Sequence, residues 1–305
     1  MKFSIFQSSR QGGRRYNQDR LAYSYSRDAL LMVVADGMGG HFHGEIASQI
    51  AVQFLVENFQ KLATPALKDP LRFLVATINQ AHEAIGDYVL AHGLSEHPRT
   101  TCVACVVQDN HAYWAHVGDT RLYFFHGGKL ASRTRDHSLV QQLFEQGKIT
   151  EDEMTTHPER NKVYSCLGGP IPPDIELSRK MLLREGDTLL MCSDGLWGLL
   201  STDEIASILD TYPITTAVPE LLDHAELRGG EGGDNLSAIG MRWGDEKLFT
   251  PRSISTATMP LDTYTVQLNT FSVERGGTEG EMDVTEADIE RAIAEIQAAI
   301  RKYSK

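Results

Sequence analysis

Up to about residue 244, apolar residues recur either at every second position or at helical spacing, so both strands and helices are expected. Helices are predicted over 44–62 and near 71–91, and a later one begins where Ser201 and Glu204 form a capping box. The predicted strands cover 2–8, 20–26, 30–35, 100–108, 111–117, 121–126, 175–181, 187–192 and 236–242. Because the strands cluster with paired helices between them, the pattern favours an α+β layered sandwich over a doubly wound parallel sheet.

The composition changes beyond Gly244, which predicts an appended tail. Residues 245–283 contain many Ser, Thr and Gly residues and are expected to be a linker, with a candidate short strand near 263–268. Residues 284–303 predict an amphipathic helix, because their isoleucines are spaced alternately by four and three. Either a protein partner or the rest of this chain would suit the apolar stripe of that helix.

Length, charge and cysteine usage narrow the class of protein. The chain has 305 residues with 41% hydrophobic and 23% charged residues, as expected for a globular protein. A net charge of −12 gives no attraction to nucleic acid or to an anionic membrane, so neither is expected as a partner. We expect a cytoplasmic location, since no signal peptide or membrane span is visible and the four cysteines do not form a disulfide framework. Cys102 and Cys105 lie in a β-branched run, where an odd spacing sends the two thiols to opposite faces and disfavours a redox or zinc role.

Five aspartates stand beside glycine or polar residues at the ends of apolar strands. They are Asp19, Asp36, Asp119, Asp194 and Asp234. One Asp-Gly pair is usually a turn, but five carboxylates at strand ends are harder to explain in that way. Converging carboxylates repel one another unless cations lie between them, and an all-oxygen ligand set suits Mg²⁺ or Mn²⁺.

The motifs around these aspartates carry a family resemblance. RRYNQD, VVADGMGGH, AHVGDTR, SDGLW and GGDNLS occur in this order within residues 1–244. The chain thereby resembles the bacterial form of the metal-dependent PP2C (PPM) protein serine/threonine phosphatases. The resemblance implies a phosphatase domain over 1–244, built as a sandwich of two antiparallel β-sheets flanked by α-helices.

The same resemblance implies a site with two divalent cations, Mg²⁺ or Mn²⁺. Its carboxylate ligands would be Asp19, Asp36, Asp194 and Asp234, with the carbonyl group of Gly37 as a further ligand. Asp119 is a candidate ligand for a third cation, although Gly198 stands where many relatives carry a further aspartate.

The resemblance further implies hydrolysis of phosphoserine and phosphothreonine in proteins by a water or hydroxide that bridges the two cations. Phosphoprotein substrates and an opposing bacterial serine/threonine kinase are the expected partners. Arg14 matches the phosphate-binding arginine, and its guanidinium can bind two phosphate oxygens. His41, beside the metal-binding turn, is a candidate proton donor to the leaving oxygen, and His43 is the alternative.

Residues 146–167 are polar and weakly periodic, and they resemble the flap near the active site of this family. Two other functions fit the same motifs: a non-catalytic PP2C-like module that binds a partner, and a hydrolase of small phosphate esters. The intact set of aspartates disfavours the non-catalytic module.

Overall fold

Strand β3 (Ala29–Met38) is apolar on both faces, which suits it only to the interior of the molecule. In the computed structural model, which describes residues 1–39, 43–244 and 253–268, β3 lies inside an eight-stranded sheet. Its alternate side chains enter two different cores: Leu30, Met32 and Val34 the core between two sheets, and Leu31, Val33 and Ala35 the core beneath two helices.

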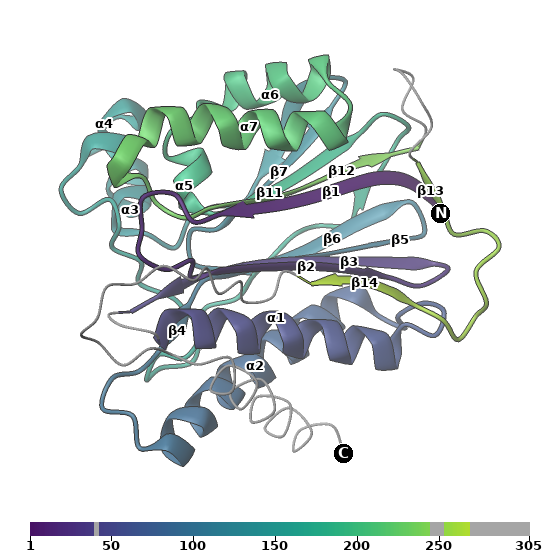
Figure 1. The fold of residues 1–305 in the computed structure, drawn as a ribbon, viewed down its shortest axis with the longest axis horizontal. Coiled ribbons are helices and arrows are strands. Elements are labelled where there is room, and N and C mark those ends of the chain that lie inside the picture. Colours follow the sequence, from purple (N-terminus) through teal and green to yellow (C-terminus); the bar gives the residue numbers. More distant parts are fainter. Residues whose placement is uncertain (40–42, 245–252, 269–305) are drawn as a thin grey trace, which may run out of the picture.

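Two antiparallel sheets face each other across the first of these cores (Figure 1). The six-stranded sheet has the order β13 (Ile254–Ser255), β1 (Lys2–Arg10), β12 (Leu236–Trp243), β11 (Thr188–Cys192), β7 (Arg121–His126) and β8 (Lys129–Arg133). The other sheet has the order β10 (Met181–Leu182), β6 (His111–Val117), β5 (Cys102–Gln108), β3, β2 (Asp19–Tyr25) and β14 (Thr265–Leu268). In addition, β4 (Arg99–Thr100) pairs with β3 and β9 (Glu176–Leu177) pairs with β6. The predicted sandwich of two antiparallel sheets is confirmed.

Helices cover the outer face of each sheet (Figure 1). Helices α1 (His43–Leu62) and α2 (Pro70–His92) cover the eight-stranded sheet, and α6 (Thr202–Thr211) and α7 (Ile214–Gly229) cover the six-stranded sheet. Four shorter helices complete the described chain: α3 (Leu139–Glu145), α4 (Glu151–Thr156), α5 (Asp194–Trp197) and the 3₁₀ turn η1 (Gly230–Gly232). Helices α3, α4 and α5 lie toward the same end of the sandwich, at the left of Figure 1.

The helix starts follow local capping chemistry. Ser201 and Glu204 form the predicted capping box at the start of α6. Thr150 and Glu153 form a second capping box, which starts α4 inside the polar segment 146–167. The sequence analysis had not identified this helix.

The predicted strand over 175–181 is wrong, because β9 and β10 are two separate strands of two residues. The interruption lies at Ser178, where the hydroxyl Oγ, instead of a backbone carbonyl, accepts the N–H of Trp114 at 2.8 Å. A hydrogen bond to a side chain therefore takes the place of one backbone hydrogen bond to β6.

Residues beyond the predicted boundary at 244 also join the sandwich. Strand β13 pairs with β1, and β14 pairs with β2 at the place of the candidate short strand. Between them, Thr256 donates to the carbonyl of Arg27 at 2.6 Å and accepts from the amino terminus at 2.8 Å. The described sandwich thus includes residues 253–268, whereas the helix predicted over 284–303 lies outside the described residues.

All four cysteines lie among the described residues and are free thiols. Cys102 packs in the core beneath α1 and α2, and Cys105 packs in the core between the sheets. The predicted opposite orientation of the two side chains is confirmed. No helix in the described part of the chain is long and apolar enough to span a bilayer.

Candidate functional site

Four of the five predicted aspartates lie at or next to strand ends, two in each sheet. In each sheet, the two strands concerned are neighbours. Asp19 begins β2 and lies opposite Asp36 of β3 in the strand register. Asp194 begins α5 directly after β11, and Asp234 lies just before β12, the neighbour of β11. Each sheet therefore contributes a pair of carboxylates.

A buried hydrogen bond joins the two pairs across the sandwich. Ser193, the residue before Asp194, donates from Oγ to Oδ2 of Asp19 at 2.7 Å. The N–H of Ser237 donates to the same Ser193 Oγ at 3.1 Å. Asp19 is 1% exposed, and its second oxygen, Oδ1, has no hydrogen-bond partner within the described structure. A buried carboxylate oxygen without a donor is a position that a cation would stabilise.

Burial and the repulsion from neighbouring carboxylates raise the pKa values of Asp19, Asp36 and Asp194. Burial raises the pKa of Asp19 to about 7; hydrogen bonds from Ser193 and Ser237 oppose the rise, and the charges of Asp194 and Asp234 add to it. Burial and Asp234 raise the pKa of Asp194 to about 6, against a hydrogen bond with Asp36 and the charge of Arg14. The fold therefore keeps these carboxylates close together despite their mutual repulsion.

Asp36 and Asp119 belong to the same electrostatic group. Burial raises the pKa of Asp36 well above its usual value, and Asp19, Asp194, Asp119 and Asp234 raise it further. Burial also raises the pKa of Asp119 well above its usual value, with the charge of Asp194 as the next contribution. All five predicted aspartates thus interact at one end of the sandwich.

Arg14 supplies a positive charge at this group. Its Nε donates to Oδ1 of Asp234 at 2.8 Å, and its Nη2 donates to Oδ2 at 2.6 Å. The Arg14 side chain is 56% exposed, so the guanidinium lies at the solvent-facing edge of the group.

Gly37 lies where the backbone of β3 meets the start of α1. Its N–H donates to the carbonyl of Gln18 at 3.2 Å. A Cβ at this position would lie 2.3 Å from the carbonyl oxygen of Gly44. No side chain fits here, so glycine is required for the close approach of the two segments.

Ser193 and Asn235 are site residues to which the sequence analysis assigned no role. Asn235 accepts the N–H of Gln18 at 2.9 Å and donates to the carbonyls of Gln11 at 2.7 Å and Tyr16 at 3.0 Å. It thereby fixes the segment before β2 against the start of β12. The available signal was the position of each residue inside a motif, next to Asp194 or Asp234.

Asp119 lies in the turn between β6 and β7, next to a stack formed by Trp197 and Arg121. The indole N–H of Trp197 donates to the carbonyl of Asp119 at 3.0 Å. The guanidinium of Arg121 lies 3.6 Å from the centre of the Trp197 ring. It also donates to both oxygens of Asp136, from Nε at 2.9 Å and 3.2 Å and from Nη2 at 2.7 Å. Asp136 is thus a buried partner of Arg121, and Ser138 is the residue that caps α3.

The donor set of this group fits hard divalent cations. Every predicted side-chain ligand is a carboxylate, and Asp19 keeps a buried oxygen without a partner. Mg²⁺ and Mn²⁺ prefer oxygen ligands, whereas zinc and copper favour nitrogen and sulfur. His41, the candidate proton donor, lies outside the described residues, and His43 begins α1.

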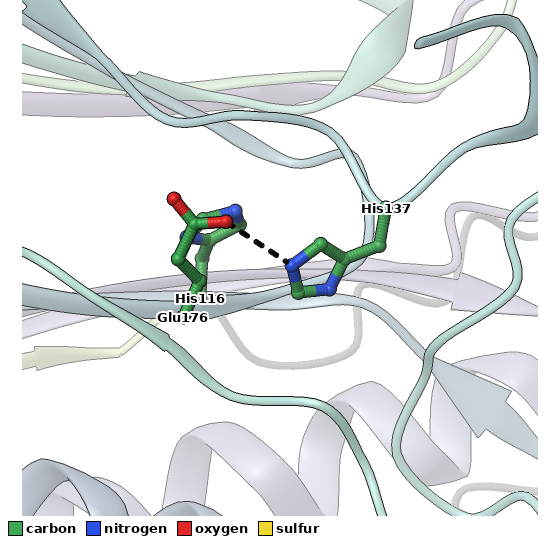
Figure 2. A group of neighbouring side chains, drawn as sticks. All are labelled: His116, His137 and Glu176. Atoms are coloured by element: carbon green, nitrogen blue, oxygen red, sulfur yellow. Dashed lines mark ion pairs between the residues drawn. The ribbon is translucent and has the colours of Figure 1, made fainter. Parts of the chain in front are cut away.

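A second cluster contains His116, His137 and Glu176 (Figure 2). Its potential ligand atoms lie within 4.8 Å of one another. Nδ1 of His137 accepts the N–H of Gly118 at 3.2 Å, so in the neutral ring Nε2 carries the proton and has no lone pair for a metal. His116 lies in β6 and is 2% exposed.

Three comparisons relate the chain to known proteins. The sequence profile described as protein phosphatase 2C matches residues 7–227. A putative protein phosphatase 2C-type of Streptococcus pyogenes is 36% identical over 224 residues, covering 71% of this chain and 88% of the relative. The crystal structure of the Streptococcus agalactiae serine/threonine phosphatase superposes with a TM-score of 0.72 at 30% identity, covering 79% of this chain and 99% of the other. The structure of the catalytic domain of PstP in complex with two manganese ions superposes with a TM-score of 0.66 at 29% identity, covering 79% of this chain and 98% of the other.

Gly37→Ala should distort the site, because the added Cβ would overlap the backbone at Gly44. We expect a loss of about 1–3 kcal/mol in the free energy of unfolding, as for an overpacked interior, together with weaker Mn²⁺ binding. Urea unfolding and calorimetric titration would measure the two effects. Gly86→Ala is the matched control: it lies within α2 with open space around it, and it should be neutral or stabilising. Equal behaviour of the two variants would contradict the close contact at Gly37.

The carboxylate repulsion should appear in the pH dependence of stability. The folded pKa values of Asp19 and Asp194, about 7 and about 6, lie above the unfolded values, so the folded state binds more protons between them. Ionisation of these two groups therefore lowers the free energy of unfolding as the pH rises through that window. His137 acts in the opposite direction, because burial lowers its pKa to about 4.

We therefore compare the wild type with Asp194→Asn in the presence of a chelator. The variant should gain stability relative to the wild type as the pH rises from about 4 to about 6, by about 1 kcal/mol or more in urea unfolding. If the difference in the free energy of unfolding between the variant and the wild type did not change with pH, Asp194 would not have a raised pKa in the folded state.

Proposed function

This chain belongs to the protein phosphatase 2C family and is a protein serine/threonine phosphatase, and we propose that Asp19, Asp36, Asp194 and Asp234 hold the two divalent cations of its catalytic site. The observation that carries the proposal is the convergence of carboxylates from both sheets around a buried Asp19 oxygen that has no hydrogen-bond donor. Its substrates are phosphoproteins.

Manganese or magnesium is the cation that we propose for this site, as in the PstP structure with two manganese ions. Two such cations supply, when bound, positive charge for the phosphoryl oxygens and a water molecule of lowered pKa. The residues of this chain provide the charge and the rigidity. Ser193 holds Asp19, and Asn235 fixes the backbone before β2, so the carboxylates are positioned before any ligand arrives. Asp119 is the proposed ligand of a third cation, and the Gly37 carbonyl is a further ligand at the main pair.

Arg14 is the proposed phosphate-binding residue. Its two donors are aligned on the carboxylate of Asp234, a planar acceptor with two oxygens. A phosphate group presents a similar pair of oxygens to a guanidinium. When Asp234 serves as a cation ligand, the two donors of Arg14 become available to the substrate.

The leaving serine or threonine oxygen needs a proton, and we propose His41 as the donor because it follows the metal-binding turn in the sequence. We further propose that the phosphatase acts in the cytoplasm and opposes a serine/threonine kinase. The four free cysteines agree with a reducing compartment.

Removal of one carboxylate should abolish hydrolysis. Asp194→Asn takes away one anionic ligand, so kcat/KM for a phosphothreonine peptide in Mn²⁺ should fall at least about 100-fold. The wild type should lose its activity in a chelator and regain it when Mn²⁺ is restored. Asp210→Asn, an exposed substitution in α6, is the matched control. Wild-type turnover by Asp194→Asn at limiting Mn²⁺, or chelator-resistant activity, would refute the assignment.

Arg14→Ala should raise KM more than it lowers kcat, because Arg14 binds phosphate in both the ground state and the transition state. A lost charge-assisted hydrogen bond costs about 1.5–3 kcal/mol, which corresponds to a rise in KM of about 10-fold to 100-fold. Steady-state kinetics on the same peptide would measure this change. Arg15→Ala, whose guanidinium lies over the Tyr16 ring, should leave KM close to that of the wild type. An unchanged KM in Arg14→Ala would remove Arg14 from the phosphate site.

A further inference from the structure

The backbone pairing of β3 changes at Asp36, one of the proposed cation ligands. Strand β3 pairs with β5 on one side of Asp36 and with β4 on the other, and the register is the same in both, so Asp36 lies opposite Thr101. The N–H of Thr101 donates to the carbonyl of Asp36 at 2.9 Å. In a regular antiparallel ladder the two residues would also share the reciprocal backbone bond. Here the N–H of Asp36 donates instead to the hydroxyl oxygen of Thr101, at 3.2 Å.

Thr101 therefore binds both backbone polar groups of Asp36, one with its N–H and the other with its side chain. The neighbouring residue, Thr100, supports the same arrangement. Its hydroxyl lies 2.8 Å from the carbonyl oxygen of Asp36 and 2.8 Å from that of Thr101, and it can donate to either. Both threonines are at most 1% exposed, so water does not compete for these bonds.

The peptide group between Asp36 and Gly37 is thereby held at both ends. Its carbonyl oxygen accepts from Thr101, and its N–H donates to the carbonyl of Gln18 at 3.2 Å. This peptide group joins the proposed carboxylate ligand to the proposed carbonyl ligand. A rotation of its plane would move both of them.

The hydroxyl of Thr101 is itself fixed by the turn between β6 and β7. It shares a hydrogen bond with the hydroxyl of Thr120, the residue after Asp119. The methyl group of Thr101 packs against Gly118, where a Cβ would lie 2.6 Å from that methyl carbon. Since Thr101 is held on this side, its hydroxyl has little freedom to turn away from Asp36.

We propose that Thr101 is a positioning residue of the cation site. Its hydroxyl holds the backbone of Asp36, and through it the Asp36 carboxylate and the Gly37 carbonyl, in place for the cation pair. The inference rests on the proposed function, because it takes Asp36 and Gly37 as cation ligands. Groups that support metal ligands without touching the metal change the metal affinity by about 10-fold to 100-fold when they are removed.

Two substitutions separate the hydroxyl of Thr101 from the shape of its side chain. Thr101→Val keeps the branched side chain and its methyl contact with Gly118 but removes the acceptor for the Asp36 N–H. Thr101→Ser keeps the hydroxyl and removes the methyl group. Thr77→Val is the matched control: Thr77 is 2% exposed in α2, and its hydroxyl donates to the carbonyl of Phe73 at 2.7 Å. None of the proposed ligands lies on that helix.

Mn²⁺ binding would be measured by calorimetry on the folded proteins, and hydrolysis of a phosphothreonine peptide would be followed as Mn²⁺ is raised. Thr101→Val should bind Mn²⁺ at least about 10-fold less tightly than the wild type and should need correspondingly more Mn²⁺ for half-maximal hydrolysis. Its KM for the peptide at saturating Mn²⁺ should stay close to that of the wild type, because Arg14 is unchanged. Thr101→Ser should lie nearer to the wild type than Thr101→Val, and Thr77→Val should match the wild type.

Wild-type Mn²⁺ affinity in Thr101→Val would overturn the inference, and so would an equal loss of affinity in Thr77→Val. A Thr101→Ser variant as weak as Thr101→Val would also overturn it, because the hydroxyl would then not be responsible. If Thr101→Val does not fold, Thr101→Ala takes its place, since it removes the hydroxyl without setting a methyl group against the Asp36 N–H. Absence of Mn²⁺ binding to the wild type, by contrast, would refute the proposed catalytic site.

Discussion

Repulsion among carboxylates that are held together at one end of the sandwich is the constraint on which the structure depends. Burial raises the pKa values of Asp19, Asp36 and Asp194, and the negative charges of their neighbours, Asp234 among them, raise these values further. The two facing sheets enforce this proximity, since each contributes two of the four groups. The fold thus maintains an unfavourable interaction that divalent cations relieve, and for this reason the same residues govern both stability and the proposed chemistry.

Neutral donors and tight backbone packing hold the carboxylates in place. Ser193 links the sheets through Asp19, and Asn235 ties the chain before β2 to the start of β12. At Gly37 the absence of a side chain allows β3 to meet α1. The hydrophobic cores on either side of β3 make these contacts rigid, because β3 is buried on both faces. Preorganised ligands need little rearrangement when a cation binds.

The apolar pattern predicted a layered α+β sandwich, and the resemblance to the protein phosphatase 2C family specified its two antiparallel sheets. The aspartates at the strand ends were a local signal in the sequence. A strand with apolar residues on both faces, such as β3, must lie inside, and an aspartate that ends such a strand lies at the rim of the sheet. The role of Ser193 was not predicted, since its partner Asp19 is 174 residues away in the sequence. Strands β9 and β10 were merged into one because the hydroxyl of Ser178 interrupts the ladder, and side-chain substitution of a backbone bond leaves no pattern in the sequence.

The most direct test of the central claim is an anomalous difference map from crystals of the full chain grown with Mn²⁺. We predict two strong peaks among Asp19, Asp36, Asp194 and Asp234, with a third, weaker peak beside Asp119. Density for the cations elsewhere, for example between His116 and Glu176, with none among the four aspartates, would contradict the account.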